Sequence, residues 1–220
     1  MTSSRSILDR EIAEIRDNLL RLGYLVDVAI ERALQALTQN DVELAQRVIN
    51  DDEAINTLRF DIEDACLRLI ATQQPAASDL RTAMAAVSIA TDIERMADHA
   101  SGIAKTVLRM GPAAPPRPPA DLNPMAHAAR RMLRATLDAF VNRDAEAARR
   151  IAAEDDEVDH MYKVLFDDLI QKMAGDASAI TPCTYLLWCG HNLERIGDRA
   201  TNIAERIIFM TTGTLKELNL

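Results

Sequence analysis

Apolar residues recur at every third or fourth position through most of the 220-residue chain. This spacing places them on one face of an α-helix, and no stretch shows the alternation of apolar and polar residues that a half-buried strand requires. Residues that cap or break helices separate six such segments. The segments predict helices at residues 5–38, 41–72, 76–110, 124–141, 144–174 and 182–212. The pattern therefore predicts an all-α fold.

A proline-rich segment divides the chain into two halves. Six of the eight prolines lie between Gly111 and Pro124, where fixed backbone angles and missing amide protons prevent a regular helix. Three predicted helices precede this segment and three follow it. We therefore expect two three-helix units, at residues 5–110 and 124–212, joined by a linker at 111–123. Capping residues mark four helix starts: Asp41, Asn123 before Pro124, Asp144, and Thr181 before Pro182.

The two halves contain the same motif. Residues 92–104 read Asp-Ile-Glu-Arg-Met-Ala-Asp-His-Ala-Ser-Gly-Ile-Ala, and residues 192–204 read Asn-Leu-Glu-Arg-Ile-Gly-Asp-Arg-Ala-Thr-Asn-Ile-Ala. Glu-Arg-x-x-Asp is identical in both, and its neighbours change conservatively. Two acids four residues apart share one helix face, and their repulsion costs about 0.2–0.5 kcal/mol. A repulsion present in both halves indicates that a cation is expected beside each pair.

An apolar stripe in each repeat sets the orientation of the acidic pair. The stripes consist of Ile89, Ile93, Met96, Ala100, Ile103 and Val107 in the third helix and of Cys189, Leu193, Ile196, Ala200, Ile203 and Ile207 in the last. On a helical wheel the Glu and the Asp lie roughly 150° from the stripe. We therefore expect both pairs to face away from the main core, open to solvent or to a partner, rather than buried as in a ferritin-like bundle.

The second helices carry related oxygen-bearing pairs, because Asp52 and Asn56 match Asp155 and Asp159 at an offset of 103 residues. If the second and third helices of each half pack antiparallel, these pairs approach the Glu-Arg-x-x-Asp motifs. The candidate metal ligands are then Asp52, Asn56, Glu94 and Asp98 in the first half and Asp155, Asp159, Glu194 and Asp198 in the second. Oxygen ligands suit iron, manganese, magnesium or carboxylate-bound zinc without choosing among them. Because Asn56 replaces an acid, we expect the second site to bind metal better.

An ordinary solvated face is the alternative for each acidic pair. Glu-x-x-x-Asp is common on helices, and Arg95 or Arg195 is available as a surface ion-pair partner. The duplication and the second-helix pairs favour a metal or partner site, although common ancestry also preserves identities. His191, three residues before Glu194, is either a nitrogen ligand or a solvated histidine. His99 is expected to point away from the acidic face.

Composition narrows the class of protein. The formal net charge is −9 and the basic residues are scattered among acids, which argues against nucleic acid or anionic lipid as a partner. Cys66, Cys183 and Cys189 form no Cys-x-x-Cys pair and are expected to be reduced core residues. The N-terminus lacks an apolar signal core, and no run approaches the ~18 apolar residues of a membrane span. We therefore expect a cytoplasmic protein without membrane insertion.

Three motifs together resemble the bacterial PhoU family over about residues 8–212: the Glu-Arg-x-x-Asp of each half, and the Gln-Pro-x-x-Ser-Asp-Leu-Arg at 74–81 that opens the third helix. The resemblance implies two pseudo-symmetric three-helix bundles with multinuclear metal, usually iron or zinc, on each acidic motif. It also implies a cytosolic homodimer that contacts the ATPase PstB of the Pst phosphate transporter and the sensor kinase PhoR. The implied role is negative regulation of phosphate uptake and of the phosphate regulon.

Three kinds of function are open at this point. We favour a non-enzymatic adaptor whose acidic faces bias the conformational equilibrium of a kinase or an ATPase. The sequence lacks a nucleophile elbow and a Gly-rich phosphate loop, which argues against nucleophilic catalysis. The alternative is a carboxylate-bridged dinuclear metalloenzyme, either an oxidase or a phosphohydrolase. A helical scaffold that uses no metal is the third.

Overall fold

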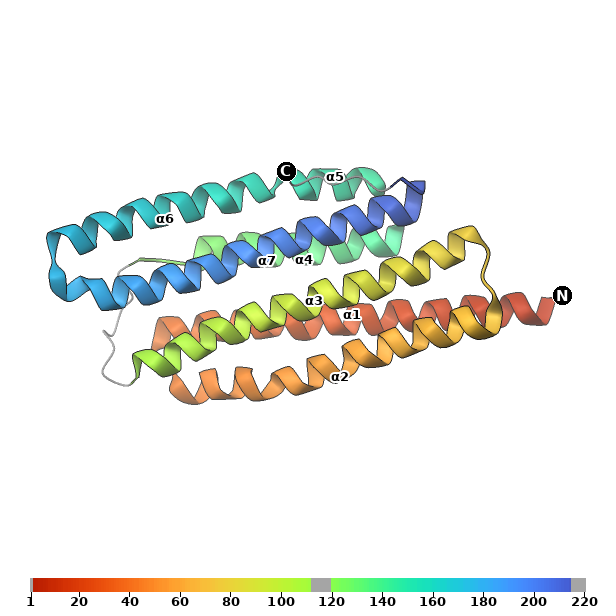
Figure 1. The fold of residues 1–220 in the computed structure, drawn as a ribbon, viewed down its shortest axis with the longest axis horizontal. Coiled ribbons are helices and arrows are strands. Elements are labelled where there is room, and N and C mark those ends of the chain that lie inside the picture. Colours follow the sequence, from red (N-terminus) through yellow and green to blue (C-terminus); the bar gives the residue numbers. More distant parts are fainter. Residues whose placement is uncertain (1, 112–119, 215–220) are drawn as a thin grey trace.

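The computed structural model describes residues 2–111 and 120–214, and almost all of them are helical (Figure 1). The elements are α1 (Thr2–Gln39), α2 (Val42–Gln73), α3 (Ala77–Met110), α4 (Asn123–Asn142), α5 (Ala145–Ala153), α6 (Asp155–Gly175), the 3-10 turn η1 (Ala177–Ala179) and α7 (Ile180–Thr212). These two ranges contain no strand, so the all-α prediction is confirmed. Residues 112–119 of the predicted linker lie outside the described residues.

The helices run roughly along the long axis of the molecule, with α1, α2 and α3 in one bundle and α4 to α7 in a second bundle beside it (Figure 1). In the middle, α3 and α7 lie next to each other and run in opposite directions, and α1 also contacts α4. The apolar residues of both bundles form one continuous buried cluster. The two halves therefore share a core that α3 and α7 hold together.

Both predicted apolar stripes face this core, because every one of their residues is fully buried in α3 or α7. Burying a side chain such as Ile93 or Leu193 contributes roughly 1.5–3 kcal/mol to stability. The three cysteines are also buried and form no disulfide, as expected. No helix within residues 2–111 and 120–214 is both long enough and apolar enough to cross a membrane.

Two of the predicted helix caps are present. The amide of Leu44 donates to Asp41 Oδ1 at 2.8 Å, and the amide of Ala147 donates to Asp144 Oδ1 at 2.9 Å. Each bond satisfies an amide at a helix start that has no partner within the helix.

The two caps predicted before prolines are wrong by one or two residues. Helix α4 already begins at Asn123, with Leu122 at the cap. Helix α7 begins at Ile180 rather than after Thr181, because η1 leads directly into it. Asp176 caps that turn by accepting from the amide of Ser178 at 2.8 Å. Proline is tolerated throughout the first helical turn, so it marks a helix start only to within a few residues.

The predicted helix at 144–174 is also wrong, because the chain breaks at Glu154 into α5 and α6. The Glu154 amide bonds to the Ile151 carbonyl at 3.0 Å, three residues back, which ends α5 with a tight turn. Helix α6 then starts with three acids, Asp155, Asp156 and Glu157, in its first turn. Negative side chains are favourable at a helix N-terminus, so the acidic run supports a new start here.

Candidate metal centre

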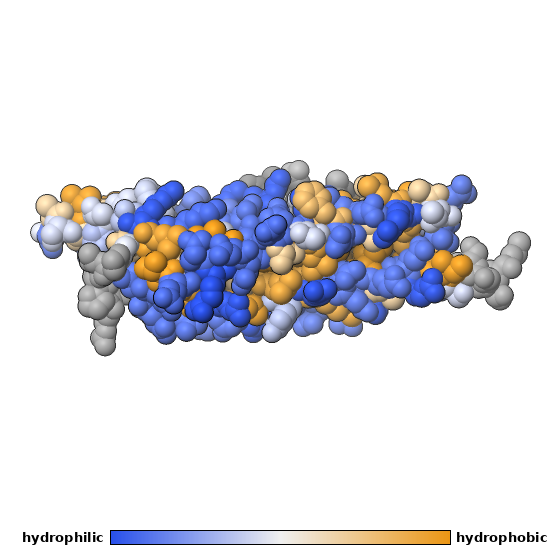
Figure 2. Space-filling view, turned by 90° about the horizontal axis from the view of Figure 1, so that it is seen from below, coloured by the Kyte–Doolittle hydropathy of each residue, from blue (hydrophilic) through white to orange (hydrophobic). Residues whose placement is uncertain are grey.

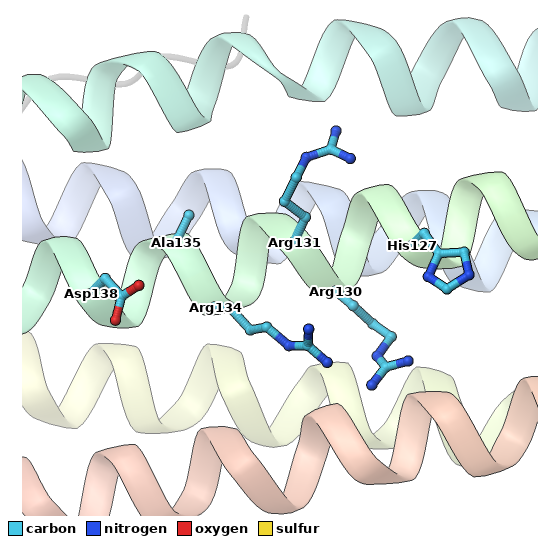
Figure 3. A pocket seen from close by; sticks show the side chains of 6 residues that line it. All are labelled: His127, Arg130, Arg131, Arg134, Ala135 and Asp138. Carbon is cyan, nitrogen blue, oxygen red and sulfur yellow. The ribbon is translucent and has the colours of Figure 1, made fainter.

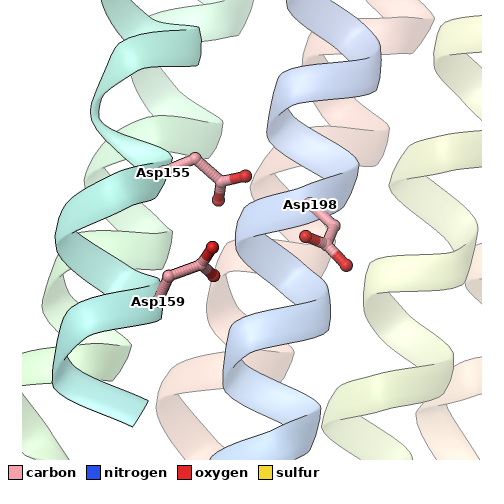
Figure 4. A group of neighbouring side chains, drawn as sticks. All are labelled: Asp155, Asp159 and Asp198. Carbon is pink, nitrogen blue, oxygen red and sulfur yellow. The ribbon is translucent and has the colours of Figure 1, made fainter. Parts of the chain in front are cut away.

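Three aspartates of the second half lie together between α6 and α7. Asp155 and Asp159 are one turn apart on α6, and Asp198 faces them from α7 (Figure 4). One carboxylate oxygen from each lies within 4.8 Å of the others. Asp155 is buried, Asp198 is half-buried and Asp159 is exposed, so the group is open on one side. The structure thus brings together three of the four acids that we predict for this site.

Glu194 belongs to the same acidic group, one turn before Asp198 on α7. Burial, followed by the charges of Asp198 and Asp159, raises the pKa of Glu194 to about 7. Its Oε2 atom is buried without a hydrogen-bond partner in the described chain; His191 Nδ1 lies 3.3 Å away, outside hydrogen-bond geometry. Burial and Asp198 also raise the pKa of Asp159. The four acids repel one another and favour an added cation or proton, so they fit the metal that the resemblance implies.

Gly197 leaves space for the Asp155 carboxylate. A Cβ atom added at Gly197 would lie 2.7 Å from Asp155 Oδ1, a distance that real Cβ atoms essentially never show. The first half has Ala97 at this position, and Asp52 in place of Asp155. The glycine therefore permits an approach between α6 and α7 at Asp155 that an alanine would obstruct.

The first half places Asp52, Asn56, Glu94 and Asp98 at the equivalent positions of α2 and α3. Asn56 Nδ2 donates to Asp52 Oδ2 at 3.0 Å, and Ser101 Oγ donates to Asp52 Oδ1 at 3.4 Å. Burial, followed by the charge of Asp98, raises the pKa of Asp52 and the pKa of Glu94. These acids are close enough to influence one another, but the Asn56 amide stands where the second half has a fourth carboxylate.

Two cations lie near the first-half acids, and the sequence analysis missed both. Arg59 on α2 acts against the raised pKa of Glu94, and Lys105 on α3 acts against that of Asp52. The corresponding residues of the second half are Tyr162 and Glu205. The offsets of 103 and 100 residues that align the two halves would have revealed both exchanges, because they pair each cation with an uncharged or acidic residue.

The surroundings of Arg59 and Tyr162 differ accordingly. Arg59 lies 3.8 Å above the Phe60 ring and donates from Nη1 to Glu63 Oε1 at 2.7 Å. In the second half an aromatic pair replaces this ion pair, with the rings of Tyr162 and Phe166 6.5 Å apart. Burial and the nearby Glu194 raise the pKa of Tyr162, which keeps it neutral. Helix α6 thus presents an uncharged phenol where α2 presents a guanidinium.

The acids of the two Glu-Arg-x-x-Asp motifs are unequally enclosed, because Asp98 is exposed, as the wheel argument predicts, and the other three are half-buried. Asp155 is 5 % exposed and the Glu194 side chain 21 % exposed, because α6 packs against α7 beside them. The alternative, an ordinary charged surface on which the acids pair with arginines, is correct for one acid, because Arg195 Nη1 donates to Asp198 Oδ2 at 2.8 Å. His99 points away from the acids, as predicted, and its Nδ1 lies 3.1 Å from Asn192 Oδ1 across the contact between α3 and α7.

The chain matches the family described as "PhoU domain" twice, at residues 19–107 and 122–207. A protein of Rhizobium meliloti (strain 1021) named "Phosphate-specific transport system accessory protein PhoU homolog" is 39% identical over 209 residues, covering 94% of this chain and 88% of that protein. A Clostridium acetobutylicum protein of the same name is 36% identical over 217 residues, covering 98% and 99%. Both names describe accessory proteins, in agreement with the expected non-enzymatic role.

Two crystal structures share the fold. The phosphate transport system regulatory protein PhoU from Streptococcus pneumoniae superposes with a TM-score of 0.88 at 37% identity, covering 96% of this chain and 100% of that one. PhoU from Pseudomonas aeruginosa gives a TM-score of 0.87 at 35% identity, covering 94% and 99%. Similarity of this extent includes both halves and the contact between them.

Proposed function

The chain belongs to the PhoU family, and on this basis we propose that it is a regulatory adaptor of phosphate uptake that binds metal at its two acidic groups. It acts on the cytoplasmic side as a homodimer, contacting the PstB ATPase of the phosphate transporter and the sensor kinase PhoR. Its role is negative, so the phosphate regulon stays off when phosphate is plentiful. The names of its relatives, which are phosphate transport accessory and regulatory proteins, support this role.

The observation that carries the metal part of the proposal is the acidic group of the second half. Asp155, Asp159, Glu194 and Asp198 would hold the metal there with carboxylate oxygens, and Asp52, Glu94 and Asp98 with the Asn56 amide oxygen would do so in the first half. Iron or zinc is the expected occupant, and manganese or magnesium suits the same oxygen atoms. A bound cation would supply the positive charge that lets α6 and α7 pack without repulsion between these acids.

An adaptor of this kind works by binding one state of its partner better than another. A protein that bound both states equally would leave the conformational equilibrium unchanged. We propose that the metal-loaded surface around α6 and α7 favours the inactive state of PhoR or of the transporter ATPase. Metal then acts as a structural part of the docking surface rather than as a catalyst.

The double substitution Glu194→Ala with Asp198→Ala tests both parts. We expect unchanged helicity by circular dichroism, reduced bound metal by elemental analysis, and loss of phosphate-dependent repression in cells. A matched control, Asp167→Ala with Asp168→Ala, removes two exposed acids from α6 outside the group and is expected to change neither metal content nor repression. Undiminished metal content would overturn the metal part. Full repression by a metal-depleted variant would overturn the link between metal and regulation.

A further inference from the structure

A polar groove lies between α3 and α7, and none of the eight candidate metal ligands lines it. Its volume is about 450 Å³, within the usual range of small-molecule sites. We call it the α3–α7 groove and define it by the side chains of Ser88, Thr91, Arg95, Arg199, Asn202 and Arg206, together with Asp92 and Glu205. Both halves of the chain contribute, so the groove exists only in the joined molecule.

Positive charge exceeds negative charge in this groove, although the whole chain has a formal net charge of −9. Three guanidinium groups, of Arg95, Arg199 and Arg206, line it with two carboxylates, of Asp92 and Glu205. Arg199 Nη1 lies 3.5 Å from Asp92 Oδ1, a long ion pair. The Nε atoms of Arg199 and Arg206 are buried without hydrogen-bond partners within the described ranges. The protein itself therefore uses only part of the hydrogen-bonding capacity of these arginines.

A second arginine-lined cavity, of about 280 Å³ along α4, shows the contrasting case (Figure 3). Its Arg130 donates to both Asp27 oxygens, at 2.8 and 3.0 Å, and its Arg134 donates to Asp27 at 2.7 Å. Arg131 donates to Glu157 at 2.9 Å. Because carboxylates at short distances already hold these arginines, the α4 cavity offers little to a further anion. The α3–α7 groove differs in that the Nε atoms of two of its arginines, Arg199 and Arg206, are buried without hydrogen-bond partners among the described residues.

The groove is also not a simple by-product of the duplication. The residue equivalent to Ser88 in the second half is Trp188, whose ring lies 5.9 Å from the Arg109 guanidinium. The residue equivalent to Arg206 in the first half is Thr106. One side of the contact between α3 and α7 therefore has the small Ser88 and the additional Arg206. The equivalent positions on the other side are occupied by the bulky Trp188 and by Thr106.

We propose that the α3–α7 groove binds an oxyanion of the phosphate type, either inorganic phosphate or the phosphoryl group of a small molecule. The planar guanidinium fork matches the oxygens of a phosphoryl group and can bind two of them at once. Arginines from both helices line one cavity, and the Asn202 amide, which donates to Asp92 Oδ1 at 3.5 Å, has a second N–H that can serve as a further donor. An anion held there would join the two halves of the molecule through α3 and α7.

Isothermal titration calorimetry on chelator-treated full-length protein at fixed ionic strength tests this site without involving metal. The probes are inorganic phosphate, tripolyphosphate and ATP. Arg95→Gln with Arg206→Gln removes the charge, and Ser88→Trp fills the groove with the residue that stands at the equivalent position of the second half. Arg131→Gln with Arg134→Gln is the matched control, because it removes two arginines from the α4 cavity.

We expect saturable binding of at least one probe, weakened about tenfold or more by the groove variants and unchanged by the control. Binding of phosphate as tight as that of the larger probes identifies free phosphate as the ligand, whereas binding of the larger probes alone identifies a phosphorylated small molecule. No saturable binding by any probe, or equal loss in the control, would overturn the proposal. If Ser88→Trp fails to fold by circular dichroism, the arginine variant decides. None of these outcomes affects the metal proposal.

Discussion

The two halves follow the same order of helices, interrupted at Glu154 in the second half, and carry the same Glu-Arg-x-x-Asp motif, but they surround it with different charges. In the first half Arg59 and Lys105 lie near Asp52 and Glu94, and Asn56 donates a hydrogen bond to Asp52. The first acidic group is therefore partly neutralised by the protein itself.

In the second half the corresponding cations are absent, since Tyr162 and Glu205 occupy their positions. Four acids gather there, and the pKa of Glu194 rises to about 7. The motif alone therefore does not define a cation site. Each motif arginine acts on its own group, and Arg195 pairs with Asp198, so the halves differ in the further cations: the first group has Arg59 and Lys105, and the less neutralised second group gains more from an added ion.

We expect the largest difference in metal affinity between the halves when one carboxylate in each is replaced by an amide of the same shape. Asp155→Asn should weaken metal binding about 100-fold or more. Mutating a residue that only supports a metal ligand by a hydrogen bond costs about 10–100-fold in affinity, and we expect the loss of a ligand itself to cost at least as much. Asp52→Asn should cost about tenfold or less, since that group keeps its own cations. Competition titration of zinc against a chromogenic chelator measures both. Equal losses in the two halves would contradict the comparison.

A second test alters the space around the second group without touching a carboxylate. Gly197→Ala puts a Cβ 2.7 Å from Asp155 Oδ1 and should displace that carboxylate, lowering metal affinity about tenfold or more. Ala97→Gly is the control, because it introduces the glycine in the half whose acids are already partly neutralised. Its effect on affinity should be small, with a loss of helix stability of about 1 kcal/mol. Unchanged zinc affinity in Gly197→Ala would show that Asp155 does not need this space.

The first group can also be converted toward the second. Asn56→Asp replaces a hydrogen-bond donor with a carboxylate and should raise metal affinity in the first half about tenfold. Adding Arg59→Tyr should raise it further by removing the opposing cation. Metal-free protein should become less stable in both variants, because repulsion from Asp52 is no longer offset. If zinc affinity stays the same, the sequence difference at these positions does not explain the asymmetry.

The smallest expected effect is on the pH dependence of stability. The pKa of Glu194 rises from its ordinary 4.5 to about 7 on folding. Between pH 4.5 and 7 the folded, metal-free protein therefore binds up to one proton more than the unfolded chain does. Its free energy of unfolding should therefore fall as the pH rises from 4.5 to 7, by roughly 1–2 kcal/mol, because solvent still reaches part of the group. Glu194→Gln should flatten this slope. Urea unfolding in the presence of chelator measures it.

The matching variant in the first half is Glu94→Gln. Burial and Asp98 raise the pKa of Glu94 in the same direction, whereas Arg59 lowers it. We therefore expect Glu94→Gln to flatten the slope less than Glu194→Gln does. A larger effect from Glu94→Gln would reverse the order proposed for the two groups.

Much of the helical fold follows from local sequence. Asp41 and Asp144 were found because an N-cap needs only one side chain and the amide of a nearby residue. The break at Glu154 was missed because neither Gly nor Pro marks it, and because a wheel of one continuous helix gives no reason to divide the segment. The acidic run at the start of α6 favours a break, but only to a reader who already considers a new helix start at this point.

The acidic ligand candidates could be predicted because related acids occur at matching positions in both halves of the sequence. The burial of Asp155 could not be predicted, because a helical wheel describes an isolated helix and does not show how close the neighbouring helix lies. The same holds for Gly197, whose importance depends on how closely α6 approaches α7. Arg59 and Lys105 were within reach of the sequence, because aligning the halves beyond the motif would have shown the reversed charges.

The contact between α3 and α7 has a consequence for how the molecule can evolve. Asp92 lies 3.5 Å from Arg199 on one side of this contact, and at the equivalent place on the other side Asn192 lies 3.1 Å from His99. Two identical single-repeat chains related by a twofold axis would have to use the same residues at both places. A single chain is free of that requirement, so selection can change one copy of the contact while the other keeps its residues. The fused repeat can thus break its own symmetry.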